Sequence, residues 1–384
     1  MKKSLLSLSI ATFALGIAEF GMMGILGDVV SGLGVSVTEA GHLISAYSLG
    51  VAVGAPLLIV FRRLPLKRLM LILGAVIFLG NLMAAISVGF RMLLVARFVS
   101  GLPHGAFFGA GAIVCSRLAN KGEGARAVAM MVGGMTVANL GGVPFVTFFS
   151  NLWNWRFAFA VVALVGMLAF GAMAMWLPRM APLPDSGLKG QFRFLRLRAP
   201  WLIYAGVFFG QASVYCWFSY VDPIMTEVTG FSSGAMTWVM MLAGAGMVGG
   251  NAFSGKLADR YGAARVSGTI ALLLVAVMTG VYFSAHIKVL SLMLMTLATA
   301  GLFGIGGPLQ YLIVRYAKGG EMLGGAGIQI AFNVSNAVSA TVGGAAIHAG
   351  FGLASPALIG VPFAVIGAAA LFLLDRAEKD PLGA

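Results

Sequence analysis

The chain has 384 residues, of which 60% are hydrophobic and only 10% are charged. Soluble domains carry about a quarter charged residues, so this chain lacks the polar surface of a water-soluble protein. A net charge of +13 could suggest nucleic acid as a partner. The basic residues gather in loops on one side of long apolar stretches, however, which excludes nucleic acid and indicates a membrane protein.

The apolar stretches are continuous, which predicts helices, whereas a barrel would show ten-residue alternation. Several exceed the roughly 20 residues that cross a bilayer core. We expect an all-α membrane protein with twelve transmembrane helices in two six-helix bundles. The predicted spans are 5–28, 38–60, 69–90, 92–114, 124–149, 156–177, 200–220, 234–255, 264–284, 289–313, 323–347 and 355–374.

The distribution of Lys and Arg predicts the topology. With both termini in the cytoplasm, 21 of the 25 Lys and Arg residues lie on that side, and only Arg91, Arg156 and Lys288 lie outside. This is the positive-inside bias of membrane proteins.

The N-terminal sequence resembles a signal peptide. Its apolar run continues to Gly27, however, which predicts an uncleaved first helix.

A polar interval rich in proline and basic residues divides the spans six and six. It predicts an N-terminal bundle over 1–178, a cytoplasmic linker over 179–199 and a C-terminal bundle over 200–384. A Gly-rich helix that leads into a short basic loop occurs once in each half, at 50–68 and 244–265. This repeated pattern supports inverted repeats of three helices within each bundle.

The loop after the eighth span reads Gly-Lys-Leu-Ala-Asp-Arg-Tyr-Gly over 255–262. It resembles motif A of the major facilitator superfamily. In that motif an acid faces a neighbouring helix and pairs with arginine, which would latch two helices at the cytoplasmic surface. The resemblance assigns this latch to Gly255, Asp259, Arg260 and Gly262. The open alternative is a solvated loop.

Other strings extend the resemblance along the whole chain. Residues 18–20 and 97–101 are similar to the first and fourth helices of the drug:proton antiporter family with twelve spans. Gly134, Gly142 and Pro144 resemble its antiporter motif. The strings at 40–45, 99–108 and 135–140 are similar to an arabinose-inducible type of sugar-efflux permease. The resemblance implies export driven by a proton gradient.

Two ionisable residues are predicted within the membrane core, Glu19 and Arg97. Counted at 1.5 Å per residue, they lie about 13 Å and about 9 Å below the outer face. Such residues are costly in lipid and usually functional. We expect them to be the proton-coupling site, with Glu19 as proton carrier. The alternative is a fixed structural pair without turnover.

Polar and aromatic side chains within the predicted spans are candidates for a substrate cavity near the midplane. His104, beside Pro103, could bond a substrate or relay protons, although a structurally satisfied histidine is equally consistent. Gln329, Asn333 and Asn336 share one face of the eleventh span. The complete set of substrate-binding candidates is Tyr47, His104, Asn139, Gln211, Tyr215, Tyr220, Gln310, Gln329, Asn333 and Asn336.

We therefore expect a monomeric, multi-pass protein of a bacterial-type inner membrane, in contact with lipid, that exports a small solute by proton antiport with alternating access. The cargo class is a sugar, a sugar-like compound or a drug-like amphiphile. No cofactor other than the proton gradient and no metal site is expected, since Cys115 and Cys216 lie in separate spans. An uncoupled facilitator or channel is the alternative. A membrane enzyme is disfavoured because the sequence shows no nucleophile–base set.

Overall fold

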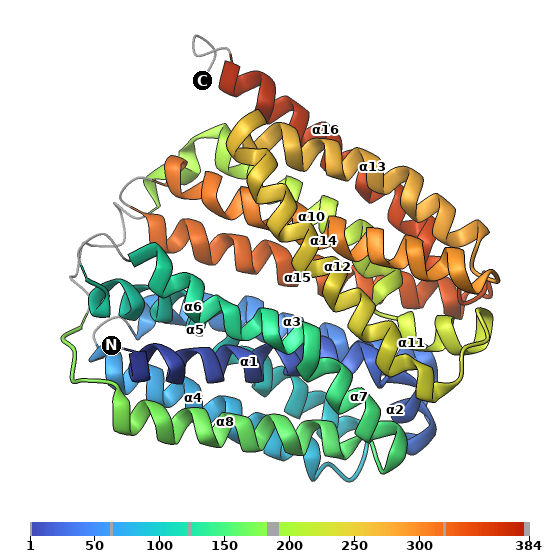
Figure 1. The fold of residues 1–384 in the computed structure, drawn as a ribbon, viewed down its shortest axis with the longest axis horizontal. Helices are drawn as coiled ribbons and strands as arrows, with labels where there is room; N and C mark the ends of the chain where they lie inside the picture. Colours follow the sequence, from blue (N-terminus) through green and yellow to red (C-terminus); the bar gives the residue numbers. More distant parts are fainter. Residues whose placement is uncertain (1, 62–63, 121–123, 183–191, 318–319, 380–384) are drawn as a thin grey trace.

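The computed structural model describes residues 2–61, 64–120, 124–182, 192–317 and 320–379. Every regular element in these ranges is a helix (Figure 1). The all-α prediction is confirmed. Continuous apolar sequence allows only this outcome, because a helix satisfies every backbone polar group within its own segment.

The helices fall into two consecutive series along the chain. The first series comprises α1 (Lys2–Gly24), α2 (Leu26–Leu33), α3 (Val37–Val60), α4 (Leu66–Ala85), α5 (Phe90–Leu118), α6 (Gly124–Val137), the π-helix η1 (Ala138–Gly142), α7 (Val143–Leu152) and α8 (Arg156–Trp176). The second comprises η2 (Arg193–Arg196), α10 (Arg198–Phe218), α11 (Val221–Pro223), the π-helix η3 (Ile224–Val228), η4 (Ser233–Ala235), α12 (Met236–Tyr261), α13 (Ala263–Phe283), α14 (Lys288–Tyr316), α15 (Glu321–His348) and α16 (Pro356–Lys379).

Ten helical stretches in the described ranges are long and apolar enough to cross a membrane. They account for every predicted span except 38–60 and 234–255. At those two positions the chain forms α3, of 24 residues, and α12, of 26 residues. Large apolar side chains such as Leu79, Val95 and Phe283 are more than half exposed, as expected of a surface that faces lipid rather than water.

Two backbone irregularities interrupt helices that the sequence predicts to be continuous. The first predicted span, 5–28, breaks at Ile25, where α1 ends and α2 begins. The fifth span, 124–149, contains the π-helix η1. The first interruption is tolerated because neighbouring helices enclose it, with Ile25 fully buried.

The two series of helices lie side by side and meet through α3 with α15 and through α7 and η1 with α12 (Figure 1). Hydrogen bonds between the series join Thr38 to the carbonyl of Gly344 (3.1 Å) and Asn151 to the carbonyl of Ser233 (3.0 Å). Both bonds lie at the end of the molecule that carries α2 and α11. The start of α1 and the end of α16 lie at the opposite end (Figure 1).

The predicted division into bundles at 179–199 stays a prediction. Residues 183–191 of that linker lie outside the described ranges. Of the remainder, Arg193–Arg196 forms the short helix η2.

Candidate functional site

Glu19 lies in the last third of α1 and is only 1% exposed. Neither of its carboxyl oxygens has a hydrogen-bond partner among the residues that the structure describes. A buried carboxyl without hydrogen bonds is costly to keep charged. Such a group can exchange a proton when water, a cation or a ligand reaches it.

His104 on α5 links this carboxyl to a third helix. Its Nε2 atom lies 3.8 Å from Oε2 of Glu19, and its Nδ1 atom lies 2.8 Å from the Tyr47 hydroxyl on α3. The imidazole also stacks on Phe108, with ring centres 5.2 Å apart. If the Tyr47 hydroxyl donates to Nδ1, the proton of a neutral imidazole resides on Nε2, which faces Glu19. The three side chains therefore form a polar chain across α3, α5 and α1.

Arg97 is fully buried on α5, but it does not form an ion pair with Glu19. Its guanidinium donates hydrogen bonds to the carbonyls of Ala18 (2.7 Å) and Leu43 (3.3 Å). It also lies over the ring of Tyr47, 4.4 Å from the ring centre. The direct ion pair of the structural-pair alternative is therefore not present in this structure, and the coupling role of the two residues stays a prediction. Helix rotation directs Arg97 at backbone carbonyls of α1 and α3, while Glu19 faces His104.

A close crossing of α3 and α5 brings these side chains together. Gly50 and Gly54 of α3 face backbone carbonyls of α5, and Gly101 of α5 faces the carbonyl of Tyr47. A Cβ atom at any of the three would collide with the facing backbone. Small residues one turn apart allow such contact in membranes, and here they set the positions of Tyr47 and Arg97.

A second set of buried polar groups lies on α10 and α15 and on η1. Gln211 donates to the carbonyl of Leu302 (3.0 Å), but its amide oxygen has no partner in the described part of the chain. The same holds for further predicted cavity atoms: Asn139 Oδ1, the Tyr215 hydroxyl, Asn333 Oδ1 and both amide atoms of Asn336. Buried polar groups are normally satisfied, so this concentration points to water or a ligand that supplies the missing bonds.

Aromatic rings connect the two polar regions. Phe20, next to Glu19, contacts Phe303 of α14, with ring centres 5.7 Å apart. Phe303 contacts Phe332 of α15 (6.4 Å), which in turn contacts Tyr215 of α10 (5.4 Å). This series of rings crosses from the first set of helices to the second and offers faces on which a sugar ring or an amphiphile can pack.

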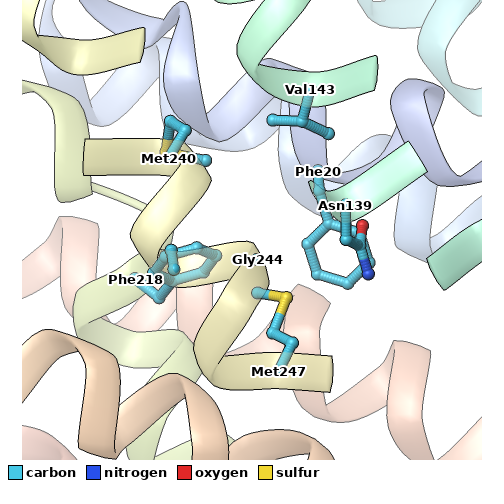
Figure 2. Close-up of a pocket in the computed structure, with 8 residues that line it drawn as sticks. Phe20, Asn139, Val143, Phe218, Met240, Gly244 and Met247 are labelled. Carbon is cyan, nitrogen blue, oxygen red and sulfur yellow. The ribbon is translucent and has the colours of Figure 1, made fainter. Parts of the chain in front are cut away.

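A small cavity lies between the two series of helices (Figure 2). Its volume is about 10 Å³, which is at most enough for one water molecule. Figure 2 shows Phe20 and Asn139 on one side and Phe218 and Met247 across from them. The complete lining is Phe20, Asn139, Val143, Phe218, Met240, Ala243, Gly244 and Met247. A solute does not fit here in this arrangement, so the helices must separate to admit one.

Comparison with known proteins decides the family. The profile of the Major Facilitator Superfamily matches residues 8–328. The chain belongs to the Major Facilitator Superfamily. The protein AraJ of Escherichia coli (strain K12) is 45% identical over 381 residues, covering 99% of this chain and 97% of AraJ. The inner membrane transport protein YdhP of the same strain is 34% identical, covering 98% of this chain and 96% of YdhP.

Solved structures show the same superfamily fold. A bacterial homologue of the human lysosomal transporter Spinster, inward-facing and unoccupied, gives a TM-score of 0.73 at 16% identity, over 97% of this chain and 96% of that one. The D-xylose–proton symporter gives 0.75 at 14% identity, with the same coverages. The chain is thus a membrane transporter of the superfamily and not an enzyme, as predicted.

The superfamily's motif A occupies the junction of α12 and α13. Gly255, Asp259 and Arg260 lie within α12 rather than in a loop. Gly262 has φ +91° and forms the turn to α13. Asp259 is exposed and forms no ion pair with any described residue. The structure thus places a glycine turn at the predicted latch. The carboxylate of Asp259 has no ion-pair partner among the described residues.

The stretch that resembles an antiporter motif packs against α1. Gly134 faces the carbonyl of Ser9, and a Cβ atom on Gly142 would lie 2.7 Å from Ile17. Pro144 lies in the first turn of α7, which begins at Val143 directly after the π-helix η1. The motif's small residues therefore permit contact between α1 and the irregular fifth span, close to Asn139.

Three predicted cavity residues do not join the buried polar groups. Tyr220 lies beyond the end of α10, and its hydroxyl donates to the carbonyl of Ala340 (2.5 Å). Its role in substrate binding stays a prediction, since α10 ends at Phe218 and the Tyr220 hydroxyl already has a backbone partner. Gln310 and Gln329 are only partly buried, in the halves of α14 and α15 that lie nearer the 316–321 connection.

One buried acid was not among the predicted sites. Asp222 follows the seventh span and is 6% exposed. It accepts a hydrogen bond from the backbone N–H of Gly27 (2.5 Å). Its carboxyl thus bonds the first turn of α2, which belongs to the other series of helices.

Proposed function

We propose that this transporter exports a small solute in exchange for protons by alternating access. The observation that carries the proposal is Glu19, a mid-span acid buried without hydrogen bonds and 3.8 Å from His104. A buried, unsatisfied acid in a membrane core is a functional site by default. Tyr47 and His104 extend it into a chain of exchangeable protons.

The contacts of Arg97 favour Glu19 as a proton carrier over Glu19 as one half of a fixed ion pair. The guanidinium of Arg97 is held by the carbonyls of Ala18 and Leu43 and by the Tyr47 ring. Its Nε and Nη1 atoms are thus bonded without the Glu19 carboxylate, although its Nη2 atom has no partner among the described residues. The charge of Arg97 still acts on Glu19 at longer range, so the carboxyl can alternate between charge states without disrupting a bond.

The unpaired amides and hydroxyl on η1, α10 and α15 support a cargo rich in hydrogen-bonding groups. The rings of Phe303, Phe332 and Tyr215 support a cargo with a flat or apolar face. A sugar or sugar-like compound has both, since its hydroxyls bond the amides and its C–H face packs on aromatic rings. A drug-like amphiphile is the second cargo class.

The described arrangement supports an inward-facing state. Two hydrogen bonds between the series lie at the α2–α11 end, which the positive-inside bias assigns to the outside, and a third joins Ser45 of α3 to the carbonyl of Ala337 further along the helices. Opening then occurs at the cytoplasmic end.

The proposal includes twelve spans, with α3 and α12 as the second and eighth. It also includes two bundles, over 1–178 and 200–384, each with two three-helix repeats.

Proton coupling is tested by flux into proteoliposomes. Sugars, amphiphiles and drugs are first screened by thermal shift, and a stabilising compound is then used as cargo. We expect accumulation against its gradient only when a pH gradient is imposed. Flux that dissipates the cargo gradient at the same rate with or without the pH gradient would instead support the uncoupled facilitator.

Both termini are expected in the cytoplasm, because 21 of 25 Lys and Arg residues then lie on that side. Reporter fusions after Arg62 and after Lys379 should both give cytoplasmic signals. A fusion after Val88, in the loop between α4 and α5, should give the opposite signal. A periplasmic reading from either of the first two fusions would refute this topology.

Asp259→Asn is expected to slow transport without lowering expression. Asp259 is exposed here, so its latch would form only when the cytoplasmic end closes. Losing a charge-assisted bond there costs about 1.5–3 kcal/mol, enough to shift the balance of states about tenfold. Transport rates are compared with those of Lys256→Gln, an exposed neighbour on α12. Equal rates in the two variants would show that Asp259 forms no latch.

A further inference from the structure

Asp222 joins the two series of helices at their outer end. It lies in α11, directly after α10, and its carboxyl accepts the Gly27 N–H of α2 (2.5 Å). Helix α2 starts after the break at Ile25, so the N–H groups of its first turn have no partner within the helix. A carboxyl oxygen can accept this bond in either charge state, because the proton of a neutral carboxyl group is carried by the other oxygen.

The contact is close. A Cβ atom on Gly27 would lie 2.9 Å from Oδ2 of Asp222. A larger residue at position 27 would therefore require the Asp222 carboxyl to shift. Since Asp222 is 6% exposed, it loses nearly all its water when the two series meet.

The charged groups that act on Asp222 are both acidic. They are Asp28 of α2 and Glu227 of η3. Asp28 in turn accepts a hydrogen bond from Ser150 of α7 (2.6 Å), and α1 contributes Glu19, two turns below Gly27. Burial, together with these two acids, raises the pKa of Asp222 from 3.8 to about 7, while the Gly27 hydrogen bond opposes the change.

We propose that Asp222 is a proton-sensitive outer latch: closing the outer end buries its carboxyl against Gly27 and takes up a proton from the outside. The latch is separate from the Glu19 site and rests only on the proposed exchange between inward-facing and outward-facing states. Its effect is to make external acid favour the closed outer end.

The direction follows from the two charge states of Asp222. In the open arrangement its carboxyl faces water and has its ordinary pKa of 3.8, whereas in the closed arrangement its pKa is about 7. Between these values the closed form holds a proton that the open form lacks. Closure is therefore favoured as external pH falls from 7 towards 4, by up to about tenfold per pH unit. This bias is lost as pH rises through 7.

The test measures the distance between spin labels across the outer end. Labels are placed at Val88 and Phe351, which are 89% and 71% exposed in outer loops of the two series. The buried Cys115 and Cys216 are replaced by serine, and Glu19→Gln removes titration at the other site. In nanodiscs, the distance should lengthen as pH rises through about 7. Asp222→Asn, which keeps an acceptor but cannot titrate, should hold the short distance from pH 5 to 8.5.

Two further variants complete the design. Glu39→Gln removes an exposed acid at the same end and should retain the pH response. Gly27→Ala should displace the Asp222 carboxyl and favour the long distance even at pH 5. An unchanged pH response in Asp222→Asn, a short distance in Gly27→Ala at all pH values, or no response in the parent would each overturn the latch. The proposed function is tested separately, by measuring uphill export by the wild-type protein.

Discussion

Glu19→Gln is expected to abolish export driven by a pH gradient while substrate binding and folding survive. Glutamine keeps the size of the side chain and can hydrogen-bond to His104, whose Nε2 lies 3.8 Å from the carboxyl. It cannot exchange a proton. Uphill accumulation in proteoliposomes should fall to the level of empty vesicles, whereas binding measured by tryptophan fluorescence and cargo exchange without a pH gradient should persist.

The matched control is Glu39→Gln. Glu39 is exposed and bonded to Ser36 at the start of α3, so its neutralisation should leave uphill export intact. A well-folded Glu19→Gln protein that exports normally against a gradient would remove Glu19 from the coupling mechanism.

A misfolded Glu19→Gln protein would support the structural-pair alternative. That alternative expects a buried, uncompensated Arg97, at a cost of about 3–5 kcal/mol. The structure argues against this cost, because the guanidinium donates to Ala18 and Leu43 and lies over Tyr47. Thermal unfolding of Glu19→Gln distinguishes the two alternatives. The carrier role predicts an almost unchanged unfolding midpoint, whereas the structural pair predicts a lower one.

The ten apolar helices of the described ranges could be predicted from the sequence because apolar length alone selects a helix in lipid. The interruptions at Ile25 and within Ala138–Gly142 could not. A helix break in a membrane depends on what surrounds the freed backbone groups, and these neighbours come from distant parts of the chain. For Gly27, the neighbour is Asp222, 195 residues away.

The members of the Glu19 site could be predicted one by one, but their pairing could not. Intramembrane charge identifies Glu19 and Arg97, and depth along the helices places them close together. Which of them meets His104 depends on helix rotation about the α3–α5 crossing. Residue depth carries no information on rotation, so the sequence could not show whether Glu19 faces Arg97 or His104, and both residues remain candidates.

Gly101→Ala is expected to destabilise the protein by about 1–3 kcal/mol, the usual cost of overpacking a tight contact. The added methyl group would collide with the carbonyl of Tyr47. That atom belongs to the α3 backbone, so α3 and α5 must separate to relieve the clash. Separation would also displace Tyr47 from His104 and from Arg97. Thermal unfolding in detergent should show a lower midpoint, and proton-driven transport should fall with it.

Gly133→Ala is the matched control, because nothing lies within 4 Å of a Cβ atom at Gly133 on α6. In both variants alanine raises intrinsic helix propensity, by up to about 1 kcal/mol. Gly133→Ala should therefore unfold at the wild-type temperature or slightly above it. A Gly101→Ala midpoint equal to that of Gly133→Ala would mean that α3 and α5 accommodate the methyl group. The glycines of this crossing would then not set the geometry of the Tyr47–His104–Glu19 chain, and another contact would have to hold its three helices in register.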